Sequence, residues 1–162
     1  MSRKGLRLAI CSTLAAACIG SFLSIPARAD DALTADGATD GVQLVIKSIK
    51  RNDGDTVTVR FQIVNNSDGS FDLSSAIRDS TTHDGYGVVS GVYLLDQSNK
   101  KKYLVVRDAD GNCVCATMAS IDKGKTENLW ATYPAPPADT QKVTVVVPTF
   151  EPVDDVPIAA SQ

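Results

Sequence analysis

The sequence predicts an all-β fold, and three observations point to it. Short runs in which apolar and polar residues alternate recur along the chain, and a period of two is typical of a strand with one buried face. No segment of 12 or more residues has helical periodicity. The chain has 17 Asp against 2 Glu, and Asp favours turns over helix interiors because its carboxylate competes for nearby backbone N–H groups.

The N-terminus predicts a secretory signal peptide over residues 1–29. A basic start precedes an uncharged, largely apolar run from 8 to 25, and small residues follow at Ala27 and Ala29. This order is typical of an exported protein, with cleavage expected between Ala29 and Asp30. We therefore expect a protein that is secreted or located in the periplasm or cell envelope.

Two alternatives to cleavage after Ala29 stay open. An uncleaved membrane anchor is disfavoured because the apolar run is short and contains Ser, Thr, Gly and Cys, whereas a spanning helix needs about 20 apolar residues. Lipidation at Cys18 is the second alternative, since Leu14-Ala-Ala-Ala17 resembles a lipobox with Ala three residues before the cysteine. We expect no membrane span after signal cleavage.

The charge of the chain beyond residue 29 is negative. It has 12 basic against 19 acidic residues there, a net charge of −7. Nucleic acid and anionic membrane surfaces are bound through basic surfaces, so neither is expected as a partner. The remaining residues are enough for one domain with its own core.

The first predicted strands form a hairpin. Residues 30–41 are polar and small and predict a flexible lead-in, so the ordered domain is expected over 42–158. Apolar residues alternate with polar ones in 42–47 and again in 57–63. Asn52-Asp-Gly-Asp55 between them has the chemistry of a hairpin turn, and the two strands are expected to pair antiparallel.

The other predicted strands are shorter, and a tail is expected over 159–162. Several are apolar on both faces, as in strands covered on both sides, and Trp130 is expected in the core. About seven short strands in a domain of this size are typical of an immunoglobulin-like antiparallel β-sandwich. The remaining strands are predicted at 89–96, 103–108, 129–133, 143–147 and 156–158.

One long polar stretch runs from residue 67 to 87. Loops of this length in small domains are often functional. Phe71, His83 and Tyr86 are the residues in it that we expect to contribute to a binding surface. A shorter segment, Asp108-Ala-Asp-Gly-Asn112, predicts a turn, because its glycine stands at the fourth position and not at the sixth as in an EF-hand calcium loop.

Cys113 and Cys115 are the two cysteines that remain after signal cleavage. On a flat strand their Cα atoms would lie about 7 Å apart, at the outer limit for a disulfide, and a bend after Gly111-Asn112 would shorten that distance. A disulfide is expected in an oxidising compartment. The alternatives are a redox-active thiol pair or a Cu(I) site completed by Met118 and His83.

No catalytic residue, cofactor or metal is expected. His83 is the only histidine of the chain, so a Ser-His-Asp or Cys-His-Asp site would have to include it. An exposed loop histidine is the simpler interpretation, and a hydrolase stays the less favoured alternative.

Four segments resemble a secreted immunoglobulin-like domain of unknown function from actinobacterial extracellular proteins, which sometimes stands ahead of an OmpA-like domain. The resemblance covers about residues 42–158, and its more specific parts are the Gly-Asn-Cys-x-Cys and Ala-Pro-Pro segments. It implies a fold and an exported location but brings no catalytic residues. No OmpA-like module stands before Gln162, so anchoring through one is not expected. The segments are Val92-Tyr-Leu-Leu-Asp96, Lys101-Lys-Tyr-Leu-Val-Val-Arg-Asp-Ala-Asp-Gly-Asn-Cys-Val-Cys115, Leu129-Trp-Ala-Thr-Tyr-Pro-Ala-Pro-Pro137 and Lys142-Val-Thr-Val-Val-Val-Pro148.

These observations predict an exported, non-catalytic immunoglobulin-like domain. We expect it to bind a protein or a component of the cell envelope through loops at one end. The alternative is a thiol-redox or Cu(I)-binding protein that uses Cys113 and Cys115.

Overall fold

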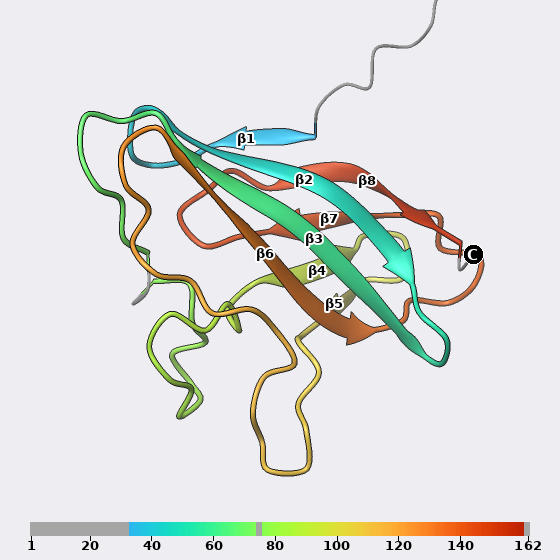
Figure 1. Cartoon of the computed structure of the whole chain (residues 1–162). Coiled ribbons are helices and arrows are strands. Elements are labelled where there is room, and N and C mark those ends of the chain that lie inside the picture. Colours follow the sequence, from blue (N-terminus) through green and yellow to red (C-terminus); the bar gives the residue numbers. More distant parts are fainter. Residues whose placement is uncertain (1–32, 74–75, 161–162) are drawn as a thin grey trace, which may run out of the picture. The chain divides into compact units, whose positions relative to one another are not determined.

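The computed structural model describes residues 33–73 and 76–160, and in these residues it contains strands and no helix. The all-β prediction is confirmed. The signal peptide, its cleavage site and Cys18 lie outside the described residues. The strands are β1 (Thr34–Asp36), β2 (Val42–Arg51), β3 (Thr56–Asn65), β4 (Tyr93–Asp96), β5 (Lys101–Tyr103), β6 (Lys125–Pro134), β7 (Lys142–Val146) and β8 (Val153–Ala159) (Figure 1).

The strands form one curled, mixed sheet in the order β5-β4-β7-β8-β2-β3-β6, with β1 beside β2. One edge of β2 is shared by two neighbours, because β1 pairs with residues 43–45 and β8 with residues 49–50. The pairing of β2 with β8 is parallel, with Ile49 opposite Ile158. The prediction of a purely antiparallel sheet is therefore wrong: β8 fills the edge that the short β1 leaves open and runs in the same direction as β2.

The hairpin of β2 and β3 is confirmed. The two strands pair antiparallel from Val42 opposite Asn65 to Arg51 opposite Val57. At the turn, the N–H of Asn52 donates to a carbonyl oxygen at 3.0 Å, and Gly54 has a φ of 98°. A positive φ of this kind is the reason why a glycine stands in the turn.

The ordered domain begins earlier than the expected residue 42. Strand β1 lies inside the segment predicted as a flexible lead-in, and its central residue, Ala35, is buried in the core. A strand of three small and polar residues has no apolar alternation to reveal it. Its formation depends on the backbone groups that the edge of β2 offers for pairing, and not on a hydropathy pattern of its own.

The bounds of several other predicted strands need correction, and of the strand predicted at 89–96 only Tyr93–Asp96 forms β4. Residues 104–108 of the predicted strand 103–108 are not a strand, and only Tyr103 belongs to β5, which begins earlier, at Lys101. Strand β6 is twice as long as predicted, because it pairs with β3 along its whole length, including its polar half from Lys125 to Asn128. Backbone hydrogen bonds, and not hydropathy, decide where this strand begins. Strand β8 likewise extends from Val153 through Ala159, the first residue of the predicted tail.

The core is built from the alternate residues of the long strands. In β6, Leu129, Ala131 and Tyr133 are buried, and the hydroxyl of Tyr133 donates to the carbonyl oxygen of Val92 at 3.2 Å. Trp130 points to the opposite face of the same strand and is only half-buried, so its prediction as a core residue is wrong. The period of two that buries its neighbours places Trp130 outside.

Two long loops leave the sheet, residues 66–92 between β3 and β4 and residues 104–124 between β5 and β6 (Figure 1). They contact each other at Gly87, whose carbonyl oxygen accepts a hydrogen bond from the N–H of Met118 at 2.7 Å. Gly87 has a φ of 77°, and a Cβ there would overlap the carbonyl oxygen of Met118. The two loops can approach this closely only because this residue has no side chain.

Gly87→Ala tests the close approach of the loops. We expect it to lower the free energy of unfolding by roughly 2–4 kcal/mol, since a positive φ costs about 1–2 kcal/mol for an L-residue and the overlap forces a backbone shift. Gly54→Ala is the matched control, because Gly54 also has a positive φ but nothing lies near its Cβ position. Urea denaturation of both variants measures the difference, and equal losses would contradict the proposed contact.

Candidate functional site

The two long loops enclose an open cavity of about 540 Å³. One wall comes from residues 81–88 and the other from residues 107–117. His83 lines it together with Cys113 and Cys115, which are distant from it in the sequence. The structure thus brings three of the predicted site residues to one place.

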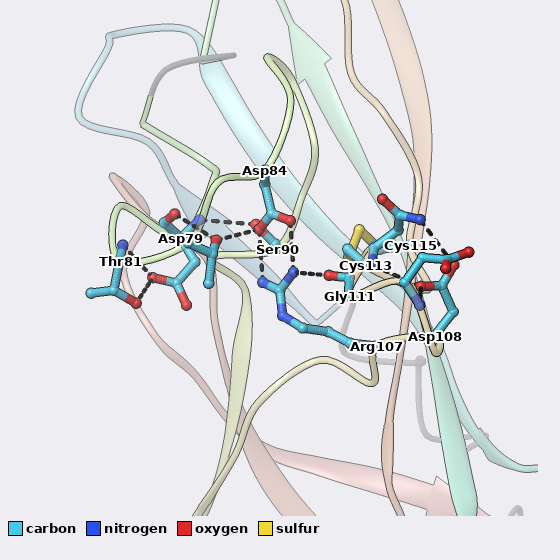
Figure 2. Close-up of polar contacts among 12 residues, drawn as sticks. Asp79, Thr81, Asp84, Ser90, Arg107, Asp108, Gly111, Cys113 and Cys115 are labelled. Atoms are coloured by element: carbon cyan, nitrogen blue, oxygen red, sulfur yellow. Dashed lines mark hydrogen bonds and ion pairs between the residues drawn. A yellow bond between two sulfur atoms is a disulfide. The ribbon is translucent and has the colours of Figure 1, made fainter.

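An ion pair between Asp84 and Arg107 joins the two walls (Figure 2). The contact is bidentate, with both guanidinium nitrogens 2.7 Å from the two carboxylate oxygens. Arg107 also donates to the carbonyl oxygen of Gly111 at 2.8 Å, and the hydroxyl of Thr82 donates to Asp84 at 2.5 Å. The Asp84 side chain is only 6% exposed and that of Arg107 28%. This geometry is the strong form of a carboxylate–arginine contact.

The pKa of Asp84 lies well below its usual value. The hydrogen bonds from Arg107 are the largest cause, and they outweigh burial, which alone would raise the pKa. Hydrogen bonds from Ser90 and Thr82 lower it further. Asp84 therefore stays charged in the folded protein under mildly acidic conditions, and the pair persists there.

A turn at Asp79 closes the base of the first wall. Its carboxylate accepts hydrogen bonds from the N–H and the hydroxyl of Thr81, at 2.9 and 2.6 Å. The N–H of Asp79 donates to the hydroxyl of Ser90 at 2.9 Å. The hydrogen bonds from Thr81 are the main cause of the lowered pKa of Asp79. The start and the end of this loop are thereby held together.

The predicted turn at Asp108–Asn112 is confirmed in the second wall. The Asp108 carboxylate accepts from the N–H groups of Asp110 and Asn112, at 3.0 and 2.8 Å. Gly111 in this turn has a φ of 85°. The Asp108 carboxylate thus accepts hydrogen bonds from the backbone that follows it, as in other Asx turns.

Cys113 and Cys115 are joined by a disulfide, with their Cα atoms 5.4 Å apart. This distance is shorter than a flat strand would give and lies in the usual range for a disulfide. Val114 between them donates to the carbonyl oxygen of Val106 and accepts from the N–H of Thr132, at 2.9 and 3.1 Å. Val106 in turn donates to Thr132 at 2.8 Å. The residue between the two cysteines therefore belongs to a set of three backbone hydrogen bonds that connects the second wall to β6.

The other predicted binding residues are separated by the structure. His83 and Tyr86 are exposed, and Tyr86 is 69% exposed. Phe71 is buried, and its backbone pairs with Ile121 through two hydrogen bonds of 2.9 and 2.8 Å. Its prediction as a binding residue is wrong, because that pairing draws it into the core. Met118 is buried too and does not line the cavity.

Sequence reasoning missed Asp84 and Arg107. Asp84 lies in a polar stretch with several other aspartates, and Arg107 lies in a segment predicted as a strand. They are 23 residues apart, and no spacing rule connects residues of two loops.

No family model matches the chain, and neither a curated protein nor a solved structure matches it. Within residues 33–73 and 76–160, no group of three or more His, Cys, Asp or Glu side chains is arranged to hold a metal ion. A helix long and apolar enough to cross a membrane is not found in this part of the chain.

Asp84→Asn tests the ion pair. We expect the free energy of unfolding to fall by roughly 2–4 kcal/mol at about pH 7, because Arg107 is left partly buried without its counter-ion. The folded-state pKa of Asp84 is lowered from 3.8, so its contribution is complete above the unfolded pKa and is lost as the pH falls toward the folded pKa. The difference between wild type and variant should shrink below about pH 4.

Urea denaturation at a series of pH values measures this difference. Asp68→Asn is the control, since Asp68 forms an ion pair with Lys123 in which both side chains are exposed. We expect no measurable change in stability for the control at any pH. A loss for Asp84→Asn that stays constant through the acid range would contradict the ionic role.

Proposed function

We propose that the protein is an exported, non-catalytic domain that binds a protein or a component of the cell envelope. The binding surface is the loop face, which we define as residues 79–88 and 107–117. The observation that carries the proposal is the bidentate Asp84–Arg107 pair, which joins two long loops, one of which carries the exposed Tyr86. Export is supported by the signal-like N-terminus.

The fixed conformation of the loop face supports a binding role. Fixing a loop before binding removes part of the entropic cost of forming a complex. Tyr86 stands between Gly85 and Gly87, and Gly87 is fixed by its hydrogen bond with Met118. Tyrosine is frequent at the centre of binding surfaces because it offers a large contact area with few rotatable bonds.

The immunoglobulin-like sandwich is part of the proposal. In that fold, strand B lies between A and E, and strand F lies between C and G. Here β3 lies between β2 and β6, and β7 lies between β4 and β8. The order supports the assignment of these six strands to A, B, C, E, F and G, with β2 joining the two groups through its contact with β8. The long loop before β4 is then the B–C loop, a binding loop in many such domains.

A non-catalytic role is supported by the surroundings of His83. A general base must lie within hydrogen-bond reach of the group that it activates. In the described residues, the His83 side chain is exposed and has no hydrogen bond to a serine, threonine or cysteine. Cys113, which lines the same cavity, is joined to Cys115.

A thiol-redox or Cu(I)-binding function is the second candidate, and one observation favours it. Cys113, Cys115 and His83 line one cavity, and thiolates with an imidazole suit Cu(I) once the disulfide is reduced. The disulfide closes a loop of only three residues, for which loop entropy gives about 1.6 kcal/mol. Its contribution to stability is therefore expected to be small.

Photo-crosslinking from the loop face tests the favoured function. With a benzoylphenylalanine in place of Tyr86, we expect one adduct of defined mass in cells that export the protein. The matched control carries the same group in place of Lys47, an exposed residue of β2. We expect no adduct from Lys47, and recovered protein that begins at Asp30. An equal pattern from both positions, or no adduct from Tyr86, would contradict the proposal.

The double variant Cys113→Ala, Cys115→Ala separates the two candidates. Under the favoured function we expect a stability loss of about 1–2 kcal/mol in urea denaturation, with the Tyr86 crosslink retained. We also expect reduced wild-type protein to yield Cu(I) to the competing chelator bicinchoninate. Stoichiometric retention of Cu(I) that is lost in His83→Ala would instead favour the second candidate.

A further inference from the structure

A second cavity, of about 410 Å³, shares Thr81 with the first. It lies against the start of the first wall and against β4 and β5. The side chains that matter for its chemistry are those of Arg78, Tyr93, Lys102, Leu104 and Pro148. Nothing in the proposed loop face uses these residues.

Arg78 is the first unusual residue of this cavity. Its Nε is buried and has no hydrogen-bond partner. In residues 33–73 and 76–160, its guanidinium takes part in no hydrogen bond or ion pair. Buried donors in proteins are nearly always paired, and leaving one unpaired costs free energy. An acceptor supplied from outside the chain would satisfy this donor.

Lys102 places a second cation beside the same cavity. Its Nζ lies 3.7 Å from the centroid of the Tyr93 ring, a cation–π contact. In the described part of the chain it forms no ion pair with a carboxylate. Asp79 also lines the cavity, but its carboxylate accepts the hydrogen bonds of the Thr81 turn. Two cations that form no ion pair in the described residues thus line one cavity of an otherwise acidic domain.

The cavity also has an apolar side. Leu104 is 52% exposed, one of two large hydrophobic side chains in the described residues with such exposure. Pro148 and the ring of Tyr93 line the same space. A ligand that fits both sides carries an anionic group and an apolar group.

The backbone around Arg78 is held in place. The N–H of Gly91 donates to the carbonyl oxygen of Ile77 at 2.8 Å. A Cβ at Gly91 would lie 2.7 Å from that oxygen and 2.9 Å from the carbonyl oxygen of Arg78. The segment that carries Arg78 is thereby packed directly against the segment before β4, so the backbone from which the Arg78 side chain extends is fixed before a ligand arrives.

We propose that this cavity binds an oxyanion carried on an apolar group. Arg78 and Lys102 hold the oxyanion, and Leu104 and Pro148 contact the apolar group. The planar guanidinium of arginine pairs with two oxygens of a carboxylate or a phosphate, so both chemistries are tested. The site adjoins the loop face and shares residues 79–81 with it, but the four residues that contact the ligand lie outside that face, and the proposal does not depend on its function.

Titrations of the protein, purified after expression of the full chain, test the site. The probes are benzoate, phenyl phosphate and inorganic phosphate. Calorimetry and amide NMR shifts measure the binding of each probe. We expect one aryl probe to bind at least about tenfold more tightly than inorganic phosphate, because burial of the ring adds to the ionic contact. The tighter aryl probe identifies the oxyanion. Inorganic phosphate binding as tightly as both aryl probes, or no saturable binding of an aryl probe, would overturn the proposal.

Arg78→Gln and Arg60→Gln form a matched pair. Arg60 lies on β3 with an exposed side chain, so both variants lose the same charge. We expect Arg78→Gln to weaken aryl-probe binding about tenfold or more and Arg60→Gln to leave it within about twofold. Equal affinities of the two variants would overturn the proposal.

Arg78→Met separates binding from folding. Because the variant removes a buried, unpaired donor while keeping the aliphatic stem, we expect its Tm to equal or exceed that of the wild type. A marked loss of Tm in both Arg78→Met and Arg78→Gln would show that the arginine supports the fold, and would overturn its assignment to a ligand. Leu104→Ser completes the test, since it should weaken the aryl probes and leave inorganic phosphate unaffected.

Discussion

The loop end of this protein depends on the ion pair between Asp84 and Arg107. The two residues belong to loops that otherwise contact each other through backbone pairing at Phe71 and Ile121 and near Gly87. Both loops are long enough for their order to be entropically costly. The bidentate contact is accompanied by hydrogen bonds from Thr82 and to the carbonyl oxygen of Gly111. These additional partners compensate for the desolvation that makes a partly buried ion pair costly. The pair therefore fixes the geometry of the cavity, and loss of either partner leaves the other charge partly buried and unmatched.

The disulfide acts beside this pair and in a different way. Arg107 lies opposite Cys113 in an isolated bridge, so the covalent link and the ionic link meet at neighbouring positions. A three-residue disulfide loop restricts the unfolded chain only slightly, and its effect is local. It bends the chain around Val114, whose N–H and carbonyl group complete the set of hydrogen bonds with Val106 and Thr132. The second wall is thus attached to β6, and the first wall is attached to the second.

The sequence predicts the strands and turns that have a local pattern, and it does not reveal the strands and contacts that depend on a pairing partner. The β2–β3 hairpin follows from alternation and from the Asn52–Asp55 turn, and both are confirmed. Strand β1 and the polar half of β6 have no such pattern, because they form where a long neighbour offers backbone groups to pair. Phe71 was expected on the surface for the same reason, since only its pairing with Ile121 draws it inward. At the site, the cysteine pair was visible from its spacing, whereas no spacing rule could connect Asp84 with Arg107.

The two cavities show that arginines close together in one structure can have opposite roles. Arg107 has its charge matched by Asp84 and donates a further hydrogen bond to a carbonyl group, so its charge is balanced without a ligand. Arg78 has neither, and its Nε is buried. A chain with 19 acidic residues has many carboxylates with which an arginine could pair, and an aspartate directly follows Arg78. That this aspartate is instead engaged by Thr81 leaves the guanidinium open on the cavity side. The same turn that secures the loop face therefore also keeps Arg78 available for an external oxyanion.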